Sequence, residues 1–294
     1  YSVYGGNTAR TAGLLSYNRF SDISVLRELA TPHLNWWGDG GFARPEPEIL
    51  EAQRLTGESV SALLASADLT PRQRKSLTTF KSARAGREGL EKLAESLPNQ
   101  DELQQREEFL AGDDMFGSNL KQQMQAALTV MQSGLGSSAD LSLGGFDSHE
   151  NHDAIHDALY THLADAITFF WDYAEKLGLA DRILLVVGSD FGRTNMYNDG
   201  NGKDHWPIGS YMLMEQGARW GNRVVGASDE LHFARKINPS SLETSESGIV
   251  LTPAHVHRAV QKYLGIDDFA ATNGIALTDV EDIALFSSSK QTRV

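Results

Sequence analysis

The sequence predicts an α/β fold: a mostly parallel central sheet flanked by helices, with a helical segment in the first half. Short apolar strands alternate with amphipathic helices from about residue 139 onward, the pattern of sheets built from strand-helix-strand units. Earlier, residues from about 47 to 133 have helical periodicity. The length of 294 residues suits a single domain. Because the chain opens at Tyr1 rather than Met, it is compatible with a processed, an engineered or a partial form, and any signal peptide would lie outside this sequence.

Two signals define the helical segment of about residues 47–133. Thr70 followed by Pro71 is typical of a helix start, with an N-cap and then a proline at the first helical position. One face of a later helix carries apolar residues that we assign to the core: Leu120, Met124, Ala127, Leu128 and Met131. Between these signals, the charged run of residues 96–114 is interpreted as the solvated face of a helix, with a hinge as the alternative.

The second half is predicted to contribute the sheet. Strands are expected over residues 139–147, 182–192, 210–216 and 222–228. Two helices are expected among them, one from about residue 155 to 177 and one that begins after Thr252. The continuous apolar run ILLVV from Ile183 is typical of a central parallel strand that is covered on both faces.

Composition argues against several classes of function. With 26 Lys and Arg against 39 Asp and Glu, the net charge of -13 argues against a nucleic-acid partner, which requires a basic face. The absence of cysteine removes disulfides, thiolate metal sites and cysteine nucleophiles together. No apolar run is long enough to cross a bilayer, so we expect no membrane span.

Three polar clusters fall at or near the ends of expected strands, where ligands bind in open α/β sheets. They are Asp147, Ser148 and His149; Ser189, Asp190 and Arg193; and Lys203, Asp204 and His205. Carboxylates beside imidazoles suit Zn²⁺, Mn²⁺ or Fe, whereas an all-oxygen site would favour Mg²⁺ or Ca²⁺. We therefore expect a divalent metal, with Arg193 and Lys203 holding an anionic phosphate or sulfate ester.

Most of these residues also have a purely structural alternative. Asp147 or Ser148 would serve as the cap of the following helix, although a cap does not require the neighbouring imidazole. Arg193 would serve as the ion-pair partner that a buried Asp190 needs. The glycine-rich loop around Asp204 would be a plain polar turn.

The histidines on expected helices are weaker candidates. His152 and His156 stand one helical turn apart, which allows shared metal ligation, and His156 is the better of the two. His162, His255 and His257 have no acidic partner nearby in the sequence. We expect these three to be structural or solvated.

Four stretches of the chain, GGFDSHENHD, GLADRILLVVGSDFGRT, GNGKDHWP and LTPAHVHRAVQKYLGID, resemble the domain-of-unknown-function 1501 family (DUF1501). Its members usually read Gly-Trp-Asp-Thr-His, then Ser-Glu-Phe-Gly-Arg-Thr, then Asp-His-Trp-Pro, in this order and at similar spacing. The resemblance covers about residues 140–270. It implies a fold like that of the alkaline phosphatase and sulfatase superfamily, with two metals at the carboxyl edge of a mostly parallel sheet, and export to the periplasm.

The resemblance also implies roles for individual residues. Asp147 and His149 match the Asp/His pair of one metal. Asp190 matches the acid of the other metal. His205, with Asp204 before it, matches the late histidine ligand.

Two departures from the superfamily pattern concern the second metal and the nucleophile. Phe191 stands where characterised phosphatases usually place a second histidine, which weakens the second metal site. The N-terminal strand that normally delivers a nucleophilic Ser or Thr is not recognisable. Within YSVYGGNTA, Thr8 would be its remnant, and loss of upstream sequence is the favoured explanation.

The sequence therefore predicts a metal-dependent hydrolase of phosphate or sulfate esters, with a small anionic ester as the substrate. The nucleophile would be a hydroxyl side chain or a metal-activated water. The alternative is a non-catalytic exported binding protein that retains the superfamily fold. A metal-free esterase is disfavoured because the chain has no Gly-x-Ser-x-Gly elbow.

Overall fold

The computed structural model describes residues 47–287 except 67, 273, 275–276 and 278, together with Ile23 and Leu26. Contacts divide the chain into two compact units. The described part of the first unit consists of residues 146–156 and the chain from residue 180 onward, and that of the second consists of the chain up to residue 145 and residues 157–179. Thr8, the candidate remnant of a nucleophile, lies outside the described residues.

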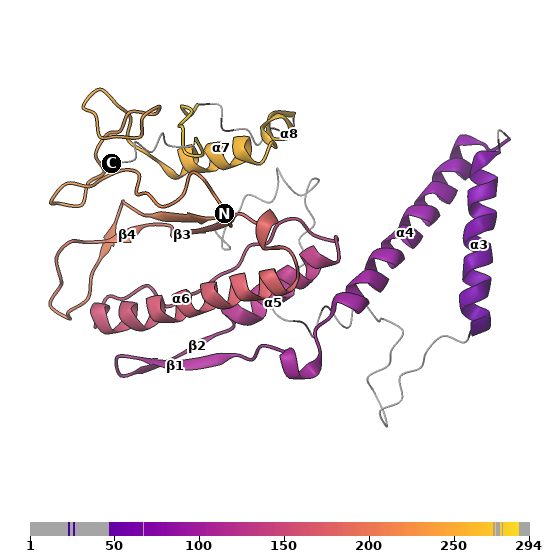
Figure 1. The fold of residues 1–294 in the computed structure, drawn as a ribbon, viewed down its shortest axis with the longest axis horizontal. Helices are drawn as coiled ribbons and strands as arrows, with labels where there is room; N and C mark the ends of the chain where they lie inside the picture. The colour runs from indigo at the N-terminus through magenta and orange to yellow at the C-terminus, as the bar shows by residue number, and fades with distance from the viewer. Residues whose placement is uncertain are drawn as a thin grey trace. The chain divides into compact units, whose positions relative to one another are not determined.

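A helical hairpin opens the described part of the second unit. Helices α3 (Pro47–Ala65) and α4 (Pro71–Ser96) contact each other and diverge from the turn that joins them (Figure 1). The predicted start of α4 is confirmed, because the Thr70 hydroxyl accepts from the Gln73 backbone N–H at 3.3 Å. In return, Gln73 Oε1 accepts from the Thr70 N–H at 2.9 Å, which completes a capping box.

The apolar face predicted for the next helix is confirmed in its main members. Leu120, Met124 and Leu128 of α5 (Leu120–Gln132) are buried. A buried cluster links this helix to α4 and to the two described N-terminal residues: Ile23, Leu26, Leu93 and Ala126. Burial of such a face is the main source of helix stability in a folded domain.

The charged run after α4 forms a β-hairpin, so the solvated helix predicted there is wrong. After a short 3-10 turn, β1 (Glu107–Ala111) pairs antiparallel with β2 (Asp114–Ser118). Phe109 faces Phe116 across the ladder, and their rings stack at 6.2 Å. Gly112 takes a φ of 65° in the two-residue turn, a conformation that glycine adopts without strain.

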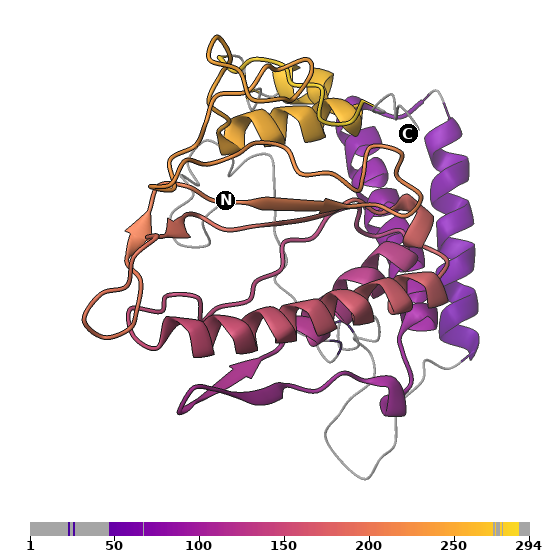
Figure 2. The ribbon, with the colours of Figure 1, turned by 60° about the vertical axis from the view of Figure 1, so that its left-hand side comes forward.

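The long amphipathic helix predicted from about residue 155 to 177 is confirmed as α6 (His152–Lys176), which follows the loop of Asp147. It runs without interruption in both ribbon views (Figures 1 and 2). Its first turn and a half belong to the first unit and its remainder to the second. Leu159 and Ala174 are fully buried, as the apolar spacing predicts.

The first unit contains two short strand pairs. β3 (Leu185–Gly188) pairs with β6 (Tyr211–Met214), and β4 (Gly192–Arg193) pairs with β5 (His205–Trp206). Every strand pairing in the described part of the chain is antiparallel, so no parallel central sheet is found there. Parallel neighbours need a crossover, usually a helix, whereas the chain between β3 and β6 forms the β4–β5 pair instead. The chain is thus mixed helix and strand, with small antiparallel sheets.

Two of the predicted strands form no ladder. Residues 139–147 are irregular and include Gly145 at a φ of 102°, outside the range of a strand. Residues 222–228 are irregular apart from one bridge between Ser228 and Ala234. Apolar alternation alone does not supply a pairing partner, and Val224 in this stretch is 94% exposed.

The last long helix is confirmed where the sequence predicts it. α7 (Pro253–Tyr263) begins after Thr252 and lies along the β3–β6 pair in both ribbon views (Figures 1 and 2). The ring of Tyr211 in β6 meets that of His257 edge-on at 5.9 Å. A short helix, α8 (Asp267–Thr272), follows. Among the described helices, none combines the length and apolar character that a bilayer crossing requires.

Candidate metal centre

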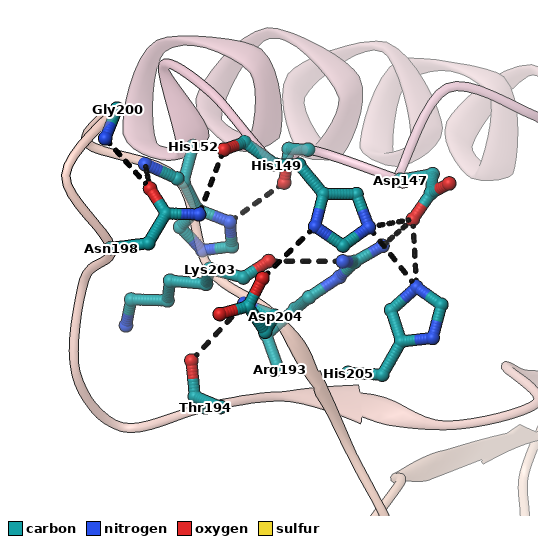
Figure 3. A network of polar contacts seen from close by, with 12 residues as sticks. Asp147, His149, His152, Arg193, Thr194, Asn198, Gly200, Lys203, Asp204 and His205 are labelled. Carbon is teal, nitrogen blue, oxygen red and sulfur yellow. Dashed lines mark hydrogen bonds and ion pairs between the residues drawn. The ribbon is translucent and has the colours of Figure 1, made fainter.

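Side chains from two distant stretches of the sequence converge within the first unit (Figure 3). Asp147 and His149 lie in the loop that leads into α6, and His205 lies in β5. Arg193 of β4 pairs with His205 in the β4–β5 ladder. The Arg193 side chain also bonds to the loop, so His205 lies close to it. Asp147, His149 and His205 form a group of candidate ligands whose ligand atoms lie within 4.8 Å of one another.

The three ligand atoms form a nearly equilateral triangle. Asp147 Oδ1 lies 3.1 Å from His149 Nε2 and 3.0 Å from His205 Nε2. The two imidazole nitrogens lie 3.2 Å apart. Because two imidazole lone pairs at this distance repel each other, the pair requires a shared proton or a cation.

The triangle fits a divalent metal with open coordination positions. An ion held tetrahedrally at about 2.0–2.2 Å separates its ligands by about 3.3–3.6 Å, a few tenths of an ångström more than these distances. The side chains of Asp147, His149 and His205 are 71%, 47% and 51% exposed. Three protein ligands that face solvent are typical of a catalytic site rather than of a closed structural one.

Asp204 lies behind one of the ligands. His149 Nδ1 lies 3.1 Å from Asp204 Oδ1, on the opposite side of the ring from Nε2. A proton on Nδ1 that is donated to this carboxylate leaves the Nε2 lone pair free for a metal. Asp204 is thus placed to orient His149, whereas the sequence predicted Asp204 itself as a ligand.

Arg193 supports the loop from its buried side. Its side chain is 11% exposed, and Nη2 donates to Asp147 Oδ1 at 2.6 Å and to the Phe146 carbonyl at 2.9 Å. Nη1 donates to the Lys203 carbonyl at 3.0 Å. The hydrogen bond from Arg193, followed by that from His205, lowers the pKa of Asp147 to about 2. The guanidinium therefore holds the ligand loop, and its Nη atoms are already bonded within the protein.

The loop between β4 and β5 is shaped around the backbone of His149. Asn198 Nδ2 donates to the His149 carbonyl at 2.9 Å, and its Oδ1 accepts from the N–H groups of Gly200 and Gly202 at 3.0 and 2.9 Å. A Cβ on Gly202 would lie 1.8 Å from that same carbonyl oxygen. Sequence reasoning missed both residues, although the run NDGNG signals a tight turn.

The remaining predicted site residues lie outside the ligand triangle. Asp190 is exposed, between β3 and β4, and Arg193 pairs with Asp147 instead. The ammonium of Lys203 lies 4.6 Å from the Tyr197 ring and is directed away from the triangle (Figure 3). His156 Nε2 lies 3.1 Å from the Phe146 carbonyl.

Neither Asp147 nor Ser148 makes the capping bond considered from the sequence. Asp147 bonds to side chains, as described above, and the buried Ser148 hydroxyl lies 2.8 Å from His152 Nδ1. The rings of His152 and His156 lie 3.9 Å apart. Burial, with the positive field of His156 second, lowers the pKa of His152 to about 4, so this imidazole is neutral at pH 7.

Two histidines that the sequence left without an acidic partner do have one. His162 Nδ1 lies 3.4 Å from Glu107 Oε2, and His255 Nε2 lies 3.2 Å from Glu281 Oε2. Both partners are distant in the sequence, at 55 and 26 residues, which is why local reasoning missed them. Both imidazoles are buried, as expected of structural residues.

Comparison with known proteins places the chain in one family. Residues 42–281 match the family described as "Protein of unknown function (DUF1501)", and the chain therefore belongs to it. The match includes the loop of Asp147, both strand pairs of the first unit and the helices from α3 to α8. No curated protein and no solved structure matches the chain.

Proposed function

We propose that the protein is a metal-dependent hydrolase of phosphate or sulfate esters. The observation that carries the proposal is the convergence of Asp147 Oδ1, His149 Nε2 and His205 Nε2 within 3.2 Å of one another on an exposed face. Ligand atoms from stretches 56 residues apart meet there. A polar cluster that only stabilised the fold would not need to be exposed, so the exposure favours a role in binding.

Each residue of the candidate site has a distinct role in the proposed reaction. Asp147, His149 and His205 hold the ion, Asp204 fixes the tautomer of His149, and the buried Arg193 keeps Asp147 ionised and in place. When bound, a divalent metal supplies Lewis acidity that stabilises negative charge on the ester oxygens. Water is the second reactant: its oxygen bonds to phosphorus or sulfur as the alcohol leaves.

The proposal assigns one ion rather than two. Among the described residues, Asp147, His149 and His205 are the group with metal-ligand spacing, and the exposed Asp190 is not part of it. The kinship with the alkaline phosphatase and sulfatase superfamily is part of the proposal and rests on the motif resemblance. Export to the periplasm likewise stays a prediction from that resemblance.

Elemental analysis of the purified native protein and of Asp147→Ala and His205→Ala variants tests the metal first. We expect close to one divalent ion per chain in the native protein and loss of that ion in both variants. Hydrolysis of 4-nitrophenyl phosphate and of 4-nitrophenyl sulfate is then followed with each metal in turn. Activity that disappears with the ion supports the proposal.

Two results would count against the proposal, in different ways. Absence of metal from the native protein, even after incubation with Zn²⁺ or Mn²⁺, overturns the metal site itself. A stoichiometric ion without hydrolysis of either ester favours a non-catalytic binding protein. His257→Ala is the matched control, because this histidine lies on α7 outside the ligand group and its loss is expected to leave the ion in place.

A further inference from the structure

An aromatic ring lies directly against one of the proposed metal ligands. The ring of Phe191 is centred 4.1 Å from the imidazole of His205, with the two planes tilted by 32°. The guanidinium carbon of Arg193 lies 5.8 Å from the same ring. Yet Phe191 is 40% exposed, so part of an aromatic surface remains open to solvent beside the ligand triangle.

The backbone that carries Phe191 is held on both sides. The Ser189 hydroxyl donates to the Phe191 carbonyl at 3.0 Å. On the other side, a Cβ on Gly192 would lie 2.2 Å from the Ile208 carbonyl oxygen, so the chain approaches its neighbour as closely as glycine allows. The ring is therefore presented by a defined turn and a strand rather than by a free loop end.

Three polar neighbours of the triangle in the described part of the chain are engaged within the protein or directed away. Asp204 bonds to His149, Arg193 bonds to Asp147 from the buried side, and the Lys203 ammonium is directed away. Phe191 is thus a partly exposed apolar ring in contact with a proposed ligand, and the organic part of an ester bound at the triangle would lie near this ring. Exposed apolar surface beside a polar site is typical of a ligand contact.

Resting on the proposed function, we propose that Phe191 selects esters of aromatic alcohols, that is, aryl phosphates or aryl sulfates. The aryl ring of the substrate stacks beside Phe191 while its anionic group occupies the triangle of Asp147, His149 and His205. Hydrolysis breaks the bond between phosphorus or sulfur and the aryl oxygen. Water supplies the new oxygen, and the phenol leaves with a proton from that water.

The chain offers a matched control in a second exposed phenylalanine. Phe233 is 47% exposed, and its ring lies 5.0 Å from that of Trp206. Trp206 follows His205 in β5, so its side chain lies on the opposite face of the strand. Phe233 therefore matches Phe191 in type and exposure but not in proximity to the ligands.

Isothermal titration calorimetry of the Zn²⁺-loaded full chain tests the inference without any turnover. Phenylphosphonate is compared with methylphosphonate, and benzenesulfonate with methanesulfonate, so that the two anion types are separated. A stacked ring pair predicts that the aryl ligand binds about five-fold more tightly than its methyl counterpart. Phe191→Leu is expected to abolish this preference, whereas Phe191→Tyr and Phe233→Leu retain it.

The outcomes separate the inference from the function on which it rests. Equal binding of aryl and methyl ligands, or a preference that survives Phe191→Leu or is lost in Phe233→Leu, overturns the aromatic selectivity alone. Failure of all four ligands to bind the Zn²⁺-loaded chain overturns the ester site and the selectivity together. Zinc content is measured for every variant, and should Phe191→Leu lose the ion, loss of the preference in zinc-loaded Phe191→Tyr overturns the inference.

Discussion

Two clusters of histidine and carboxylate in this chain use similar residues in opposite ways. One consists of Asp147, His149 and His205 in the first unit, and the other consists of His162, Glu107 and Lys121 in the second. The first is exposed, and both of its imidazole Nε2 atoms point at one carboxylate oxygen. The second is largely buried around His162, whose Nε2 has no hydrogen-bond partner.

Each cluster also contains a protein cation, and the two differ in how many imidazoles meet the carboxylate. In the buried cluster, the Lys121 ammonium pairs with Glu107 Oε1 at 2.8 Å and with Asp165 Oδ2 at 2.5 Å, so a protein cation already neutralises the carboxylate beside His162. In the exposed cluster, the largely buried Arg193 donates to Asp147 Oδ1 at 2.6 Å, and the Nε2 atoms of His149 and His205 converge on the same oxygen. A histidine beside an acid therefore indicates a metal site only where further imidazole nitrogens converge on the same carboxylate oxygen, as they do at Asp147.

Gly202→Ala is expected to give the largest effect, because the new Cβ would lie 1.8 Å from the His149 carbonyl oxygen. The loop must move, at a cost of about 3 kcal/mol in the free energy of unfolding, and His149 moves with it. Urea denaturation measures the loss. Gly200→Ala is the control, since its Cβ would meet nothing closer than a flexible Glu150 side-chain atom at 3.2 Å and would lie 3.6 Å from the same carbonyl oxygen. Equal stability of the two variants would contradict the loop geometry.

Asp204→Ala is expected to weaken metal binding about 10- to 100-fold while the three ligands remain. The reason is that His149 loses the carboxylate 3.1 Å from its Nδ1 and with it the preferred tautomer. A competition assay with a chromogenic chelator measures the change. Asp199→Ala removes an exposed acid from the same loop and should bind the ion as the wild type does. An unchanged affinity in Asp204→Ala would show that Asp204 does not orient His149.

Lys121→Met addresses the buried cluster. Its side chain is 12% exposed and pairs with Glu107 at 2.8 Å and Asp165 at 2.5 Å, so its loss is expected to cost about 1–2 kcal/mol of stability. Thermal and urea unfolding measure the change, with the exposed Lys92→Met on α4 as control. An unchanged stability would refute the structural role of Lys121.

The smallest expected effect is a pH dependence from His162. Burial lowers its pKa below the ordinary 6.5, and the carboxylate of Glu107 only partly offsets this. The unfolded chain therefore binds more protons than the folded chain once the pH falls below about 6.5, and stability declines there. His162→Phe keeps the ring that stacks on Phe109 at 4.6 Å and is expected to flatten this decline. Parallel pH profiles of both proteins would contradict it.

Local signals in the sequence predicted the helices, because a cap and an apolar face are read within a few turns. Thr70 with Gln73 and the region after Thr252 illustrate this. Strand pairing depends on partners that are distant in the sequence, so local signals do not give its direction. The predicted parallel sheet is wrong, because β3 pairs with β6 in the antiparallel sense. The hairpin of β1 and β2 was not predicted, because a run of charged residues is also typical of a solvated helix face. Gly112 and Asp113 at the turn were the local signal for a hairpin.

At the candidate site, sequence reasoning named the three converging residues but not the roles of their neighbours. Asp147 and His149 lie in the loop before α6 and His205 lies in β5, and in the sequence each imidazole stands close to a carboxylate. The direction of a long side chain is set by packing, so the sequence could not show that Arg193 turns inward or that Lys203 turns away. Asn198 was missed because its partner, the His149 carbonyl, is a backbone group.

Calorimetric titration of Zn²⁺ into the metal-free chain tests the central claim most directly. The account predicts one ion per chain in the wild type, loss of binding in His205→Ala and unchanged binding in His162→Phe, which alters the buried cluster. Binding that survives His205→Ala, or a wild type that takes up no ion, would contradict the claim that the exposed triangle is a metal centre.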